Sequence, residues 1–179
     1  MGMWFVIHVK PGCEAQALGL LKATPKADAL EELFCPMSEY LRRSQGNLDE
    51  TLQPMFEGCV FAVAPSKWEL RACMRQAEGL AVMLEGKGQF IALEEGEEGF
   101  INAWTPLPER IAPISEAEVA KGGFATVTAG PLLGHEDQIQ RWGTGHRWAF
   151  LETKIAGELT RARLGVRVTK DDSLHPWER

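Results

Sequence analysis

The sequence lacks the features that mark common enzyme classes and membrane proteins. It contains no GxSxG, HExxH or P-loop pattern, and its longest apolar runs are far shorter than a membrane span. No signal peptide is visible, because the apolar stretch from Trp4 to Val9 is too short and has no basic flank before it. We therefore expect a cytoplasmic protein that is not an enzyme and does not enter a membrane.

Paired cysteines are also missing. The four cysteines are Cys13, Cys35, Cys59 and Cys73, and they form no CxxC motif. The four histidines show no ligand spacing with these cysteines. The spacing predicts buried thiols, no metal site and no cofactor.

Charge is distributed unevenly along the 179 residues. Residues 1–105 carry nine lysines and arginines against fifteen aspartates and glutamates, whereas residues 123–170 carry seven against four. With 45% hydrophobic and 25% charged residues, the composition suits one large soluble domain or two small ones. Any nucleic-acid contact is expected in the more basic second part.

Residues 54–63 form the segment around which the first part is organised. After an opening turn they read as a strand whose two faces are both apolar. One face carries Phe56, Gly58, Val60 and Ala62, and the other carries Glu57, Cys59, Phe61 and Val63. This pattern predicts a central strand with helices on one face, while the second face is either further core or a docking surface.

Other elements are expected on both sides of this strand. Strands are predicted at 4–10, 33–37 and 81–84, with Pro36 favouring a sheet edge or a bend. Residues 40–54 are interpreted as a hairpin or a flexible loop. Helices are predicted at 14–23, after the Ser66/Glu69 capping box, and after the acidic residues 94–98. The buried stripe of the second helix is expected to be Leu70, Cys73, Met74 and Ala77.

The composition changes after Thr105. Prolines and glycines predict a linker over 106–122. Five short strands are then expected, which together fit a small barrel, followed by a loose tail from Asp171. The predicted strands are 125–129, 138–142, 148–154, 158–162 and 166–169.

The order of several motifs resembles NusG-type transcription elongation factors. The matching motifs are Trp4-Phe5-Val6-Ile7-His8-Val9-Lys10-Pro11-Gly12, Phe34-x-Pro36, Phe56-x-Gly58-x-Val60-Phe61 and Gly130-Pro131-Leu132-x-Gly134-x-Glu136. Pro113-Ile114-Ser115 and Gly130-Pro131-Leu132-Leu133-Gly134 look closest to specialised paralogues such as LoaP and RfaH. The sequence departs from the family pattern at Glu57 and Cys59, which replace a proline and a tyrosine, and at Asp137, which replaces a glycine.

The resemblance implies an α+β protein with two domains. Residues 1–105 would form an NGN-like α/β sandwich, with an antiparallel sheet and flanking helices, that binds RNA polymerase. Residues 106–122 would be the linker. Residues 123–179 would form a KOW-like, SH3-like β-barrel of five strands with a C-terminal tail.

The resemblance also implies three sets of binding residues. The polymerase clamp helices would contact Trp4, His8, Phe56, Cys59 and Phe61. The non-template DNA strand would contact Lys10, Lys67, Arg71 and Arg75. RNA would contact Arg141, Trp142, His146, Arg147, Trp148, Lys154, Arg161 and Arg163, where cations beside aromatic rings suit phosphate neutralisation and base stacking.

The function implied is that of a monomeric elongation or antitermination factor. It would suppress pausing or termination at selected operons, and its second domain would recruit nascent RNA or a ribosomal or termination protein. Two alternatives stay open at this point. One is an RNA-binding adaptor in which the KOW domain does the work, and the other is a general housekeeping elongation factor.

Overall fold

The computed structural model describes residues 2–86, 90–119, 125–143 and 147–169. The chain forms two compact units, each assembled from separate segments. Unit 1 comprises Met1–Pro36, Phe56–Ala103 and Lys154–Thr160. Unit 2 comprises Met37–Met55, Trp104–Thr153 and Arg161–Arg179. The expected C-terminal tail lies outside the described residues.

Unit 1 is built on a four-stranded sheet. The strand order is β2 (Glu32–Phe34), β5 (Cys59–Ala64), β1 (Met3–His8) and β6 (Ile91–Ala92). β5 is antiparallel to both neighbours, so it has the central position that its two apolar faces predict. β2 lies at the edge, the position that Pro36 favours, and its pairing with β5 ends at Phe34.

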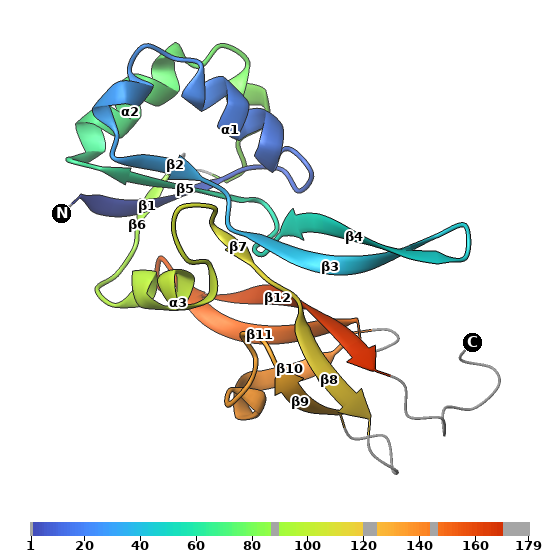
Figure 1. The fold of residues 1–179 in the computed structure, drawn as a ribbon. Helices are drawn as coiled ribbons and strands as arrows, with labels where there is room; N and C mark the ends of the chain where they lie inside the picture. Colours follow the sequence, from blue (N-terminus) through green and yellow to red (C-terminus); the bar gives the residue numbers. More distant parts are fainter. Residues whose placement is uncertain (1, 87–89, 120–124, 144–146, 170–179) are drawn as a thin grey trace. The chain divides into compact units, whose positions relative to one another are not determined.

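Two helices cover one face of this sheet. α1 (Glu14–Lys22) and α2 (Lys67–Gln76) lie on the same side of β5 and β1 (Figure 1). They bury Leu21 and Leu70 completely, and the predicted stripe of α2 is confirmed. The core beneath them is formed by alternate residues of the two central strands, Phe5, Ile7, Val9, Val60, Ala62 and Ala64.

Ser66 caps α2 as predicted, but its two bonds differ from those of a standard capping box. The Ser66 hydroxyl accepts a hydrogen bond from the Trp68 N–H at 3.1 Å and donates one to the Glu69 carboxylate. That second bond favours the ionised carboxylate, so it lowers the pKa of Glu69.

A buried carboxylate joins α1 to the start of β5. Glu14 is 3% exposed, and its two oxygens accept hydrogen bonds from the Gly12 N–H at 2.8 Å and the Gly58 N–H at 2.6 Å. Gly58 has a φ of +71°, and a Cβ there would lie 2.7 Å from the Val9 carbonyl oxygen. Glycine is therefore required where the chain turns into β5 against the end of β1.

The strand predicted at 81–84 is wrong. Leu80–Val82 instead forms a 3-10 helix, η2, and Leu84 makes only an isolated bridge to Val9. Gly79, with φ +85°, starts a tight turn that buries Leu80 and Met83 on the same side, which a strand would not do. The remaining strand of the sheet is β6, and a second short 3-10 helix, η1, spans Ala27–Ala29.

α3 (Glu97–Trp104) begins within the acidic stretch and has the acidic first turn that favours a helix there, Glu97 and Glu98. The Glu97 carboxylate accepts hydrogen bonds from the Glu94 N–H at 2.9 Å, the Ala156 N–H at 2.7 Å and the Gly157 N–H at 2.9 Å. The last two donors belong to the turn between β11 (Trp148–Ile155) and β12 (Glu158–Thr169), and this contact lies within unit 1. α3 lies on the side of the sheet opposite α1 and α2 (Figure 1).

Unit 2 contains a three-stranded sheet in the order β4 (Asn47–Pro54), β3 (Met37–Ser44) and β7 (Ile111–Ala112). Of the two possibilities for residues 40–54, the structure shows the hairpin. Its two-residue turn consists of Gln45 and Gly46, whose φ angles of 49° and 88° match the strand twist of such hairpins.

Apart from residues 154–160, which belong to unit 1, a five-stranded sheet also lies in unit 2. The order is β10 (Ile139–Trp142), β11 (Trp148–Ile155), β12 (Glu158–Thr169), β8 (Ser115–Val119) and β9 (Ala125–Ala129). A 3-10 helix, η3 (Glu136–Gln138), precedes β10. The α+β class, with a C-terminal β domain, is confirmed.

Two details of this second sheet differ from the prediction. The strands expected at 158–162 and 166–169 are one continuous strand, β12, and the fifth strand is β8, from the segment expected to be a linker. Gly165 lies within β12, between the two strands that were expected. A Cβ there would lie 1.9 Å from the Glu39 carbonyl oxygen, so glycine allows two backbones to approach closely within a strand.

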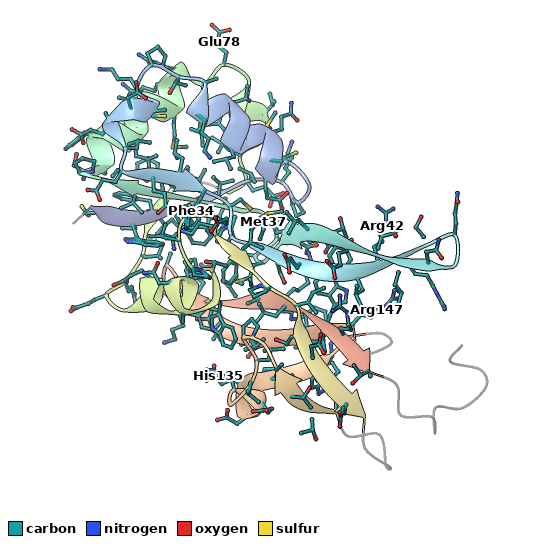
Figure 2. The ribbon with its side chains drawn as sticks, viewed as in Figure 1. Phe34, Met37, Arg42, Glu78, His135 and Arg147 are labelled. Atoms are coloured by element: carbon teal, nitrogen blue, oxygen red, sulfur yellow. The ribbon has the colours of Figure 1, made fainter. Side chains whose placement is uncertain are left out.

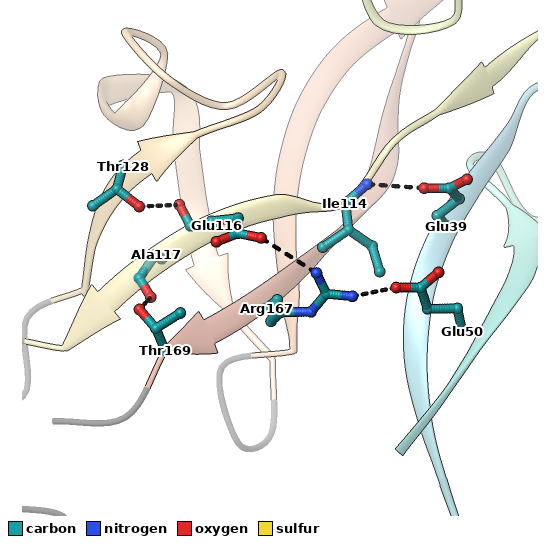
Figure 3. A network of polar contacts seen from close by, with 8 residues as sticks. All are labelled: Glu39, Glu50, Ile114, Glu116, Ala117, Thr128, Arg167 and Thr169. Carbon is teal, nitrogen blue, oxygen red and sulfur yellow. Dashed lines mark hydrogen bonds and ion pairs between the residues drawn. The ribbon is translucent and has the colours of Figure 1, made fainter. Parts of the chain in front are cut away.

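Polar contacts connect the two sheets inside unit 2 (Figure 3). Ser38 Oγ accepts a hydrogen bond from the Gly165 N–H at 3.0 Å. Arg167 donates to Glu116 at 3.2 Å and forms an ion pair with Glu50. The Ile114 N–H donates to a carboxylate oxygen of Glu39 at 3.3 Å.

Candidate functional site

The second face of the unit 1 sheet is apolar and aromatic. Strand register pairs His8 with Cys59, Val6 with Phe61 and Trp4 with Val63, so all six side chains share this face. Phe34 of β2 is paired with Phe61 and joins the same face (Figure 2). The predicted grouping of Trp4 and His8 with Cys59 and Phe61 is therefore correct.

Aromatic rings form a continuous series across this face. Trp4 contacts Phe34 edge-on at 5.6 Å between centroids, and Phe34 stacks on Phe61 at 5.7 Å. Phe61 contacts Phe56 at 5.8 Å, and Phe56 contacts Phe100 of α3 at 6.3 Å. Phe56 thus joins the predicted set although it precedes β5 and does not share the strand's alternation.

Burial divides the five predicted polymerase-contact residues. Phe56 and Phe61 are 0% exposed and Cys59 is 3% exposed, whereas Trp4 and His8 are only half-buried. The structure therefore brings all five together but leaves accessible area on two of them.

Sequence reasoning missed three residues of this face. Ile91, paired with Val6, is 40% exposed and adds accessible apolar area beside β1. Phe34 was signalled by its place in the matched Phe34-x-Pro36 motif. Ile91 and Phe100 gave no such signal. Ile91 reaches the face from β6 and Phe100 from α3, and the tertiary fold decides how these two elements pack.

The thiols of Cys35 and Cys59 lie in an environment that makes them unreactive. Burial, and to a smaller extent the negative charge of Glu14, together raise the pKa of both Cys35 and Cys59 to about 12. Cys35 Sγ also donates to the Cys59 carbonyl oxygen at 3.6 Å. Both side chains therefore act as small apolar groups that support the aromatic face.

A second predicted surface lies on α2. Lys67, Arg71 and Arg75 are exposed, and Trp68 is 61% exposed between them. Lys67 Nζ lies 5.0 Å and Arg71 Cζ 5.4 Å from the Trp68 ring centroid. Trp68 is an addition to the predicted set, and its 61% exposure marks it as unusual among large apolar residues.

Lys10, the fourth predicted DNA contact, is also exposed. It follows β1, and its backbone N–H donates to the Met83 carbonyl oxygen at 2.8 Å. It therefore belongs to the end of β1 and not to the basic face of α2.

The predicted RNA contacts lie mainly on β10, β11 and β12. Arg141, Trp148, Arg161 and Arg163 come together with Phe150, a residue that sequence reasoning missed. The backbone carbonyl of Arg147 accepts from the Val166 N–H, and Arg147 is half-buried (Figure 2). Lys154 belongs to unit 1, Trp142 ends β10, and His146 lies outside the described residues.

The Gly130-Pro131-Leu132 motif has a structural explanation in the second sheet. Gly130 has φ +92°, and a Cβ there would lie 2.6 Å from the Ser115 Cα. Ser115 is fully buried, and its hydroxyl accepts from the Leu132 N–H at 3.0 Å. The motif therefore packs the chain after β9 against the first residue of β8.

The profile of the family described as "Transcription termination factor nusG" matches residues 2–121. This chain belongs to the NusG family. Among solved structures, one titled "Domain interaction in Thermotoga maritima NusG" is similar at 16% identity. It covers 92% of this chain and 94% of that one, with a TM-score of 0.48. No curated protein matched this sequence.

Membership of the NusG family makes the chain a transcription elongation or termination factor of a family that binds RNA polymerase. Within the described residues, no group of three or more His, Cys, Asp or Glu side chains could hold a metal ion. No helix in the described part of the chain is long and apolar enough to span a bilayer.

Proposed function

We propose that this NusG-family protein docks on the clamp helices of RNA polymerase through the second face of the unit 1 sheet. The observation that carries the proposal is a face lined by Trp4, His8, Phe56, Cys59 and Phe61 that takes no part in the core under α1 and α2. Apolar area buried by a polymerase helix contributes about 25 cal/mol per Å² before the costs of association.

Docking begins at the accessible part of this face. Trp4, His8 and Ile91 offer exposed area, while the fully buried Phe61 supports them from beneath. Deeper contact with Phe56 requires Phe100 of α3 to move away from it. A bound polymerase would thereby favour a conformation with α3 displaced, because only that conformation offers the complete face.

The basic face of α2 is proposed to contact the exposed non-template DNA strand. Lys67, Arg71 and Arg75 supply positive charge, and Trp68 supplies an exposed ring for an unpaired base. Lys10 adds a further charge at the end of β1.

The proposed outcome is suppression of pausing or termination at selected operons. Binding holds polymerase in its elongation-competent conformation, and the C-terminal β domain recruits RNA or a protein partner. The likeness of residues 113–115 and 130–134 to specialised paralogues supports selectivity for particular operons over a general role.

A pull-down of RNA polymerase tests the docking face. His8→Asp places a charge on the accessible part of the face and is expected to weaken binding at least tenfold. Val82→Asp is the matched control, because Val82 is 70% exposed in η2, which packs with the helical core on the opposite side. Circular dichroism checks that both variants are folded. Polymerase binding by a folded His8→Asp protein that equals the control would refute docking through this face.

A second candidate function is an RNA-binding adaptor that works through its C-terminal domain. The burial of Phe56, Cys59 and Phe61 favours it, since these residues cannot contact a partner in the conformation described. The same pull-down separates the two functions. An adaptor would bind leader RNA normally and show no dependence of polymerase binding on His8.

A further inference from the structure

A residue of α1 holds the turn that carries part of the proposed docking face. Glu14 lies in the first turn of α1, is 3% exposed, and accepts a hydrogen bond at Oε1 from the Gly58 N–H at 2.6 Å. Its Oε2 accepts from the Gly12 N–H at 2.8 Å, which fixes the orientation of the carboxylate. A charge-assisted bond is about twice as strong as a neutral one, so Glu14 restrains the backbone of residues 56–59.

Gly58 does not set this backbone conformation by itself. Its φ of +71° is one of many values that glycine adopts at little cost. The Val9 N–H donates to the Gly58 carbonyl oxygen at 2.8 Å, but this bond does not hold the peptide group that precedes Gly58. The Cys59 thiol, a weak donor, reaches the carbonyl oxygen of that group at 3.6 Å. Among these contacts, the Glu14 bond is the shortest and the one that involves a charge.

Phe56 is the ring that this turn places. It lies two residues before Gly58 and precedes β5, so the strand register does not hold it. Its ring is fully buried, and its centroid lies 5.8 Å from that of Phe61 and 6.3 Å from that of Phe100. Docking that displaces Phe100 removes the second of these contacts. The Glu14 bond does not involve α3, so it remains to hold Phe56 against Phe61 after this displacement.

We propose that Glu14 is a positioning residue for polymerase docking, which holds residues 56–59 so that Phe56 stays against Phe61 when Phe100 moves away. The inference rests on the proposed function, because it concerns the same docking face. Glu14 is buried and does not itself touch polymerase. The apparent affinity falls in proportion to the fraction of molecules whose turn has this arrangement, so loss of the bond weakens docking even in a folded protein.

Titration of purified RNA polymerase with the full-length chain tests the proposal. Glu14→Ala should weaken binding by about tenfold, which corresponds to the docking arrangement in about one molecule in ten. Glu14→Gln keeps an acceptor oxygen for one of the two bonds and should weaken binding by about threefold.

Leu21→Ala is the matched control for loss of stability. Leu21 lies on the same helix and is fully buried, but it belongs to the core under α1 and α2 and not to the docking face. Its truncation leaves a cavity and lowers stability by an amount similar to that expected for Glu14→Ala. Binding is compared at a temperature where urea curves show both variants folded, and Leu21→Ala should then bind as the unmodified protein does. If Glu14→Ala does not fold, Glu14→Gln is compared with Leu21→Val in the same way.

NMR reports the position of the Phe56 ring directly. Nuclear Overhauser contacts between the rings of Phe56 and Phe61 should weaken in Glu14→Ala and persist in Leu21→Ala. The proposal is overturned if Glu14→Ala binds polymerase as well as Leu21→Ala does, or if the ring contacts persist unchanged in Glu14→Ala.

His8→Asp separates this proposal from the proposed function. Weaker binding by His8→Asp, together with equal binding by Glu14→Ala and Leu21→Ala, removes only the positioning role of Glu14. Normal binding by a folded His8→Asp protein removes the docking face itself, and the positioning role with it.

Discussion

Replacement of Glu14 should destabilise unit 1 more than any single surface change. Glu14→Ala removes the bonds to the Gly12 and Gly58 N–H groups, at 2.8 and 2.6 Å. The Gly58 bond is buried and charge-assisted, and its loss costs about 2–3 kcal/mol. The Gly12 N–H is more accessible to water, so its loss adds about 1 kcal/mol. The expected total is about 3–4 kcal/mol.

Urea denaturation measures this loss. With m-values of about 1–3 kcal/mol per M, the midpoint should fall by roughly 1–4 M. Glu14→Gln keeps an acceptor oxygen for one bond and should lose about half as much stability. Amide hydrogen exchange at Gly58 should accelerate in both variants. A Glu14→Ala midpoint within about 0.3 M of the unmodified protein would refute the reasoning.

The same variants test the electrostatics of the thiols. Because the Glu14 charge contributes to the raised pKa values of Cys35 and Cys59, either replacement should lower both. Burial is the larger cause and remains, so the thiols should stay above the ordinary cysteine pKa. The pH dependence of alkylation by iodoacetamide reports this shift. An unchanged profile would show that the Glu14 charge does not reach these thiols.

Three further changes test local structure. Gly165→Ala should destabilise unit 2 by about 3 kcal/mol or more, because its Cβ would lie 1.9 Å from the Glu39 carbonyl oxygen. Gly19→Ala, in open space on α1, should instead stabilise by about 0.5–1 kcal/mol in the same urea experiment. Ser66→Ala should raise the lowered pKa of Glu69 toward its ordinary value. The lowered pKa of Glu69 stabilises the folded state at pH values above the unfolded-state pKa, and this stabilisation is lost as the pH falls through the folded-state pKa. Ser66→Ala should therefore reduce this stabilisation. Acid titrations followed by NMR measure the change.

The local elements could be predicted from sequence because neighbouring residues decide them. The capping box at Ser66 specifies the start of α2, and the apolar alternation of residues 59–64 specifies a central strand. Side-chain parity even grouped His8 with Trp4 and Cys59 with Phe61 correctly, because alternation in a strand has a fixed period of two.

Elements whose form depends on distant partners could not be predicted. Gly165 lies within β12, and its role is to admit the backbone of Glu39, which is 126 positions away in the chain. The segment 106–122 reads as a linker because of its prolines, yet β8 within it pairs in parallel with β12. Parallel pairing leaves no hairpin signal, because its partner lies far along the chain.

The sequence by itself determined the family, the α+β class and the two apolar faces of β5, since these follow from local pattern and motif order. Only the tertiary structure decided which residues of the candidate sites are accessible. Phe61 is buried by Phe34 and Phe56, and Phe150 becomes a support for two arginines only when β10 and β12 flank β11. Exposure and ring contacts are properties of surfaces formed by several segments, and no single segment encodes them.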